Sequence, residues 1–408
     1  MLAWGAVGAV GLVASLLMSF MSDTSHFIPG ACDRVDSFVS ARVVGQQLAV
    51  NQLVDAVCTH LADAHPQRPL VISVHGPPGV GKTYTHTLLA RALYSSDPLR
   101  ASKCPGEDCQ GAKVVYGMNF MLESQGEQLA AVRSAILEHA RSTPDALIVI
   151  EEYDKLDCPS RGMLRQLLAS PDAANASALN RAIVLLESNL GFSELEEMLL
   201  AVEDRETISA ETAEKALRDV VFAAWVRAEC ESYPDTLKLV SMVDFFLPYF
   251  PLQRPQVEQL VGQSLSQWGD VLWHEKHARL AWGQDVVSFL TDRVDFDGPF
   301  PLEGGKQVPH VATRYVARLV RKAPLAAPPP KQVPAPAKAT SSGGSSSGVI
   351  GGELGPWACD AGGGVGGESG DAEMEAGLVC GRGSPGSPML RLVVAGGTLA
   401  LEPWPALL

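Results

Sequence analysis

Short apolar runs and longer amphipathic stretches alternate through the first half of the chain. Three almost wholly apolar runs, at residues 70–75, 147–150 and 182–186, are rich in β-branched side chains. That composition is typical of strands buried inside a parallel sheet. A weaker run at 114–116 predicts a further strand.

Amphipathic spacing predicts a helix before the first of these runs, at residues 43–64, and helices after it, at residues 82–94, 125–141 and 161–169. Strands that alternate with helices of this length form a parallel sheet with helices on both faces. We therefore predict an α/β domain over residues 36–232.

Strand signals stop beyond residue 232. Apolar spacing then predicts three helices, at residues 256–268, 284–293 and 306–321. We interpret residues 233–322 as a small helical lid domain.

The two ends of the chain differ from its middle. Residues 323–408 are rich in Gly, Pro and Ser, so we predict a disordered tail without an assigned function. Residues 1–21 carry no charged side chain and are long enough to span a bilayer. Within the segment 1–35, an uncleaved anchor, a poor signal peptide and a membrane-surface segment stay open, and we favour entry into the secretory pathway.

Net charge and cysteine spacing narrow the choice of function. The formal charge of −14, without any long Lys/Arg run, argues against a nucleic-acid binder. The eight cysteines lack the two close pairs of a structural zinc site, so we expect mostly isolated thiols. In an oxidising compartment, Cys104 and Cys109 are the first candidates for a local disulfide.

The strand at 70–75 is followed by a phosphate-binding motif of the form G-x-x-x-x-G-K-[ST]. Its residues are Gly76, Pro77, Pro78, Gly79, Val80, Gly81, Lys82 and Thr83. Between a strand and a helix, such a loop turns backbone N–H groups toward phosphates and adds the positive end of the helix. We expect it to bind ATP, with Lys82 on the β and γ oxygens and Thr83 on Mg²⁺.

Two carboxylates end the strand at 147–150. We assign Glu151 to the metal and Glu152 to orienting the attacking water. Aspartate is usual at the first of these positions, and the longer side chain of Glu151 shifts its carboxylate outward. Asn189, which follows the next strand, is a candidate for holding the water, and Lys306 is a candidate for reaching the phosphates from the lid.

These motifs together resemble an AAA+ ATPase, with Val44-Gly45-Gln46 similar to the adenine segment of Clp-type members. The torsin family is the closer resemblance, over roughly residues 43–321. The segments RPLVISVHGPPGVGKT, LIVIEEYDKL and MVDFFLPYFPLQRPQVEQLV look like torsin segments, and the third is the most specific. Gly304-Gly305-Lys306 stands where torsins have Gly-Cys-Lys, which implies a sensor role for Lys306.

The chain departs from the torsin pattern at several positions. Thr83 stands where torsins place Asn, Glu151 replaces Asp, Leu190 replaces Ala and Gly305 replaces the family's cysteine. Met242 occupies the position where Clp-type ATPases have an arginine finger. Since loss of a finger costs on the order of 10³ or more in rate, we expect slow turnover by the chain alone.

The resemblance implies a torsin-like ATPase in the lumen of the endoplasmic reticulum or nuclear envelope, associated with a membrane. It implies a partner that donates the arginine, protein or membrane-associated clients, and homo- or hetero-oligomers. A Clp-like unfoldase and a nucleotide-gated scaffold or membrane-remodelling protein with negligible hydrolysis are the alternatives. The sequon Asn175-Ala176-Ser177 offers a glycosylation test of luminal location.

Overall fold

The computed structural model describes residues 26–117, 124–169, 179–325 and 389–403. Two compact units make up the chain, one extending to Pro251 and the other beginning at Leu252. The hydrophobic run at 1–21, the sequon at 175–177 and most of the predicted tail lie outside the described residues. None of the described helices combines the length and apolar character needed to cross a membrane.

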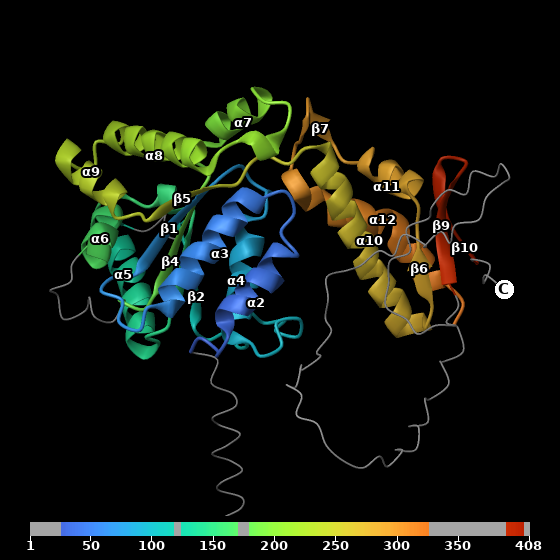
Figure 1. Cartoon of the computed structure of the whole chain (residues 1–408), viewed down its shortest axis with the longest axis horizontal. Coiled ribbons are helices and arrows are strands. Elements are labelled where there is room, and N and C mark those ends of the chain that lie inside the picture. Colours follow the sequence, from blue (N-terminus) through green and yellow to red (C-terminus); the bar gives the residue numbers. More distant parts are fainter. Residues whose placement is uncertain (1–25, 118–123, 170–178, 326–388, 404–408) are drawn as a thin grey trace, which may run out of the picture. The chain divides into compact units, whose positions relative to one another are not determined.

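A five-stranded parallel sheet forms the centre of the first unit (Figure 1). Its strands stand in the order β2-β3-β4-β1-β5. Their bounds are β1 Leu70–His75, β2 Ala112–Tyr116, β3 Leu147–Glu151, β4 Ile183–Ser188 and β5 Phe245–Pro248. The predicted α/β class is therefore confirmed, and four of the strands lie where the apolar runs predict them.

The fifth strand corrects the prediction that strands end at residue 232. Phe245–Pro248 pairs with β1 along one edge of the sheet, and Phe246 and Leu247 are fully buried. A four-residue run that ends in proline gives little strand signal, because proline is confined to strand ends and edges. Since β5 belongs to the sheet, the first unit extends to Pro251 instead of ending at the predicted boundary.

Helices flank this sheet. Near the amino end of the described chain, α2 packs against both α3 and α4 (Figure 1), and α4 contacts β3. Their bounds are α2 Ala31–Ser40, α3 Gln47–Ala62 and α4 Lys82–Tyr94. The other helices of the unit are α5 Gln125–Ser142, α6 Cys158–Ala169, α7 Phe192–Leu200, α8 Ala210–Arg227 and α9 Tyr233–Ser241. Of the helices in the first unit, the apolar spacing does not predict α2, α7, α8 and α9.

The second unit contains the three helices expected of a lid. They are α10 Arg254–Lys276, α11 Gln284–Thr291 and α12 Gln307–Lys322. The same unit contains a three-stranded sheet, in the order β10-β9-β6, which the sequence pattern does not predict. Its strands are β6 Arg279–Ala281, β9 Met389–Ala395 and β10 Thr398–Pro403. A short β7–β8 pair joins Phe296–Asp297 to Phe300–Pro301.

The predicted disorder of residues 323–408 is wrong for the hairpin of β9 and β10. Leu392 is fully buried, and Leu390 and Leu399 join it in the core that α10, α11 and α12 share. Alternating apolar side chains on β9 face this core, and β9 pairs in parallel with β6. The average composition of residues 323–408 does not reveal this hairpin, because the Gly/Pro-rich residues before it dominate that average.

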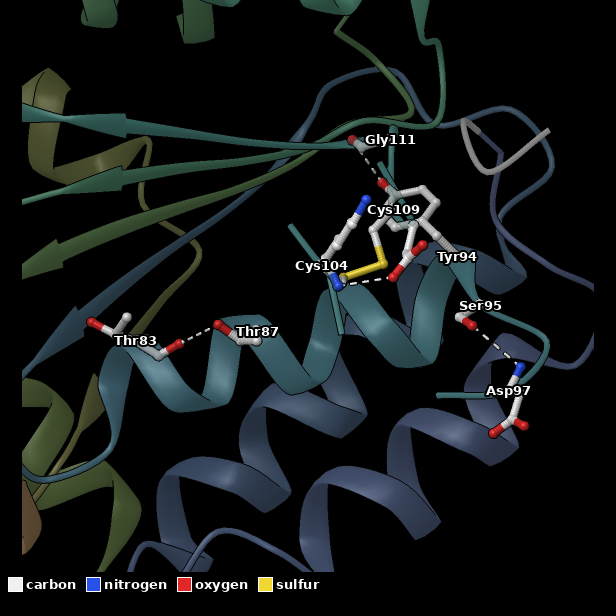
Figure 2. The surroundings of a disulfide bond; sticks show 10 residues. Thr83, Thr87, Tyr94, Ser95, Asp97, Cys104, Cys109 and Gly111 are labelled. Atoms are coloured by element: carbon white, nitrogen blue, oxygen red, sulfur yellow. Dashed lines mark hydrogen bonds between the residues drawn. A yellow bond between two sulfur atoms is a disulfide. The ribbon is translucent and has the colours of Figure 1, made fainter. Parts of the chain in front are cut away.

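The prediction of mostly isolated cysteines is also wrong for the described residues, where all six cysteines form disulfides. Cys32–Cys58 joins α2 to α3, and Cys158–Cys230 joins the start of α6 to the turn after α8. The Cys104–Cys109 pair singled out from the sequence is present. Figure 2 shows it beside the carboxyl end of α4, where the Tyr94 hydroxyl donates to the Gly111 carbonyl at 3.1 Å.

Because Leu392 is buried, Leu392→Ala should lower the free energy of unfolding by about 2–5 kcal/mol through lost burial and a cavity. Chemical denaturation of the full chain measures this change. Val394→Ala on the same strand is the matched control, since Val394 is 37% exposed, and it should change stability far less. Equal effects of the two substitutions would contradict the packing of β9.

Candidate nucleotide-binding site

The loop after β1 has the backbone geometry that its glycines permit. Gly79 and Gly81 have φ angles of 81° and 104°, which L-residues with side chains rarely adopt. A Cβ on Gly76 would lie 2.1 Å from the carbonyl oxygen of Tyr249, which follows β5. The loop therefore needs glycine both for its own turns and for its close approach to a neighbouring segment. It leads directly into the amino end of α4.

The side chain of Lys82 lies across this loop. Its Nζ donates to the carbonyl oxygens of Gly76 at 2.7 Å and Pro77 at 2.9 Å, and to Oδ1 of Asn189 at 2.9 Å. Asn189 follows β4, which is the neighbour of β1 in the sheet. Two residues predicted to act at one site thus lie in contact, although 107 positions separate them.

The two predicted carboxylates lie at the end of β3, beside β4. Burial raises the pKa of Glu151, and the charge of Glu187 raises it further, while His86 and a hydrogen bond from Thr83 act in the opposite direction. Glu152 adopts φ 54°, ψ 43°, the left-handed region that is uncommon for residues other than glycine. The chain therefore turns sharply between β3 and the following segment, and the separate roles assigned to Glu151 and Glu152 stay a prediction.

The donor atoms at Glu151 suit Mg²⁺. Its Oε1 is buried and has no hydrogen-bond partner among the described residues, and the Thr83 hydroxyl contacts the same carboxylate. Mg²⁺ prefers such hard oxygen ligands and binds through one or two carboxylates together with phosphates and water. The predicted pair of ligands therefore fits this ion.

Two buried polar residues join this site without having been predicted. His86 on α4 and Glu187 on β4 are 2% and 3% exposed, and His86 Nδ1 lies 2.7 Å from Glu187 Oε1. Burial alone lowers the pKa of His86, but the charges of Glu187 and Glu151 and the hydrogen bond to Glu187 outweigh it and raise the pKa. The sequence feature that could have identified Glu187 is a charged residue within an otherwise apolar strand. In the sheet, Glu187 pairs with Glu151 on β3.

A second polar network lies beneath the phosphate loop. His75 Nε2 lies 2.6 Å from the Ser73 hydroxyl, which in turn lies 3.2 Å from the Tyr153 hydroxyl, and His75 Nδ1 lies 3.2 Å from the Leu190 carbonyl oxygen. Burial lowers the pKa of His75 to about 3, so this imidazole stays neutral at physiological pH. The network fixes the end of β1, next to Gly76.

The remaining residues singled out from the sequence lie on other elements of the fold. Gln46 is buried and bonds both backbone groups of Phe250, through Nε2 at 2.8 Å and Oε1 at 2.9 Å, so its side chain secures the segment after β5. Met242 follows α9 and has no cationic group. Lys306 belongs to the second unit, where it is exposed, and its sensor role stays a prediction.

Because His75 is neutral in the folded chain and has an ordinary pKa near 6.5 when unfolded, acid favours unfolding. This contribution to stability is present above pH 6.5 and is lost as the pH falls toward 3, at about 1.4 kcal/mol per pH unit. His75→Gln removes the titrating group, so its stability should fall less steeply below pH 6.5. Denaturant unfolding between pH 7 and pH 4 tests this, and parallel curves for parent and variant would refute it.

Comparisons with known proteins agree with this architecture. A family model described as Torsin matches residues 18–103, and a model described as AAA domain matches residues 64–189. The AAA match implies a nucleotide-binding domain, and it spans the phosphate loop, both carboxylates and Asn189.

Two relatives carry the description torsin-like protein. The one from Drosophila melanogaster is 24% identical over 274 residues, covering 64% of this chain and 78% of its own. The one from Caenorhabditis elegans is 24% identical over 242 residues, covering 58% of this chain and 64% of its own. Taken with the five-stranded parallel sheet, these matches confirm the predicted resemblance of this chain to the torsin family and to AAA domains.

Proposed function

We propose that this chain is an ATPase of the torsin type, which binds ATP with Mg²⁺ and hydrolyses it slowly unless a partner stimulates it. The observation that carries the proposal is the contact of Lys82 with Asn189 beside the Thr83–Glu151 pair. Residues from the loop after β1, the end of β3 and the end of β4 meet there, which provides a cation, an amide and two carboxylates around one phosphate-binding loop.

Each of these side chains has a task in phosphoryl transfer. Lys82 already lies on the loop that would surround the phosphates, so it needs only to exchange carbonyl partners for phosphate oxygens. Thr83 and Glu151 would hold Mg²⁺, which neutralises charge on the phosphates. Glu152 accepts the proton of the attacking water, and Asn189 orients that water once Lys82 turns to the nucleotide.

An arginine from another chain would complete this machinery. Met242 offers no charge at the position where Clp-type ATPases carry the finger, and the neighbouring Asp244 is engaged by Arg68 and by the Val71 amide at 2.9 Å. We propose that an activator protein supplies the arginine, within a homo- or hetero-oligomer. Protein or membrane-associated clients would be the substrates of the resulting motor.

The disulfides support a luminal location. Three disulfides within the described residues are compatible with an oxidising compartment and rare in the cytosol. We propose the lumen of the endoplasmic reticulum or nuclear envelope, with membrane association through the hydrophobic run at 1–21.

A nucleotide-gated scaffold with negligible hydrolysis is the second candidate. It is favoured by Glu151, whose longer side chain shifts the carboxylate outward from the position that the usual aspartate would give it. Such a protein would bind ATP tightly and show no turnover, even with an activator.

Glu152→Gln should bind ATP as the parent does and lower hydrolysis by about 100-fold or more, because the proton acceptor is lost while the phosphate loop is kept. Single-turnover hydrolysis and binding of a fluorescent ATP analogue measure the two effects. Glu197→Gln, on the exposed surface of α7, is the matched control. Hydrolysis by Glu152→Gln at the parent rate would refute the assignment, and absence of turnover in the activated parent would favour the scaffold.

Thiol labelling of denatured chain from cells should modify at most two of the eight cysteines before reduction, and all eight afterwards. A mass shift on glycosidase treatment that disappears in Asn175→Gln would independently establish translocation. Labelling of more than two cysteines in the unreduced chain would contradict the oxidising compartment.

A further inference from the structure

Three potential metal ligands converge at the side of the nucleotide site. His86, Glu151 and Glu187 each present a nitrogen or oxygen, and these atoms lie within 4.8 Å of one another. They come from α4, β3 and β4, so three separate elements bring them together. The cluster is mostly inaccessible: the side chains of His86 and Glu187 are 3% and 4% exposed, and that of Glu151 is 16% exposed.

The hydrogen bond between His86 and Glu187 determines which nitrogen of the imidazole is available to bind a metal ion. Nδ1 lies 2.7 Å from Glu187 Oε1, so it carries the proton and donates it to that carboxylate. The other ring nitrogen, Nε2, lies 3.7 Å from Glu151 Oε1. A carboxylate on one ring nitrogen fixes the tautomer and makes the opposite nitrogen a better ligand, an arrangement that recurs at zinc sites.

Nε2 of His86 and Oε1 of Glu151 face each other without a direct hydrogen bond. Within the part of the chain that the structure describes, Oε1 is buried without a hydrogen-bond partner, and 3.7 Å is too long for a direct hydrogen bond. Two carboxylates therefore face a single imidazole in a largely buried place, where uncompensated negative charge is costly. A metal ion with bonds of about 2.0–2.2 Å to each atom would fit between Nε2 and Oε1 and satisfy both.

We propose that His86 and Glu151 bind a divalent transition-metal ion of the zinc type beside the phosphate loop, and that Glu187 orients His86 for this purpose. Imidazole suits Zn²⁺ and its neighbours, whereas Mg²⁺ prefers oxygen. The inference rests on the proposed function, because Glu151 is also the predicted ligand of the nucleotide's ion. Its consequence is that an ion of the zinc type competes with Mg²⁺ for Glu151.

The test is titration of the full, nucleotide-free chain with Zn²⁺ or Mg²⁺ after treatment with a chelator. Calorimetry should show one Zn²⁺ bound per chain, at least about tenfold more tightly than Mg²⁺, because a nitrogen ligand favours zinc. His86→Gln and Glu187→Gln should each weaken Zn²⁺ binding by about tenfold or more, the second because the loss of an orienting partner costs about 10–100-fold. His310→Gln, at an exposed histidine on α12, should leave it unchanged.

Zinc binding no tighter than magnesium binding, or equal zinc affinity in the parent and His86→Gln, would overturn the proposal and leave the cluster as a buried His–Glu pair. If His86→Gln does not fold, as judged by thermal unfolding, Glu187→Gln decides alone. Binding of a fluorescent ATP analogue in the same preparations separates the two ideas. If the parent chain binds ATP but does not prefer Zn²⁺ over Mg²⁺, only this inference is refuted. If the parent chain binds Zn²⁺ but not ATP, only the proposed function is refuted.

Discussion

The parallel pairing of β1 with β4 is the constraint on which the site depends. It places His75 opposite Ser188, so the phosphate loop and Asn189 leave the sheet side by side. The chain order reverses at this point, since β4 and β3 lie on one side of β1 and β5 on the other. In open α/β sheets ligands bind at such reversals, beyond the carboxyl ends of the strands. The Lys82–Asn189 contact is a direct consequence of the pairing.

Close backbone approaches keep this edge of the sheet in place. Gly76 lies against the backbone of Tyr249, and a Cβ on Gly117 would lie 2.5 Å from the carbonyl oxygen of Glu152. The first contact links the phosphate loop to the segment after β5, and the second links the end of β2 to the turn that carries the carboxylates. Since neither position has room for a side chain without displacing backbone, the first contact constrains the phosphate loop and the second constrains the left-handed turn at Glu152.

The sequence predicts those parts of the protein whose signals are local. The phosphate loop, the apolar strands and the helix at 82–94 follow from composition and spacing over a few residues, and their bounds agree with β1, β3 and α4. Pairing partners are not local: Cys158 and Cys230 are 72 residues apart, and nothing in their spacing identifies them as neighbours. The same holds for His86 and Glu187, which meet only because α4 lies over β3 and β4 is the next strand. β5 and the β9–β10 hairpin were missed for a related reason, since their pairing with β1 and β6 stabilises runs that are weak by themselves.

The Cys158–Cys230 disulfide gives the carboxylate turn a covalent support. Cys158 begins α6, six residues beyond Glu152, and Cys230 follows α8, which packs against β5 at the far edge of the sheet. In the chain-entropy model, closing a 72-residue loop stabilises the folded state by about 4 kcal/mol. The guanidinium of Arg161 lies beside this disulfide. Because the segment after the carboxylates is fixed to α8 in this way, its position is coupled to the β5 edge, which also contacts the phosphate loop through Tyr249.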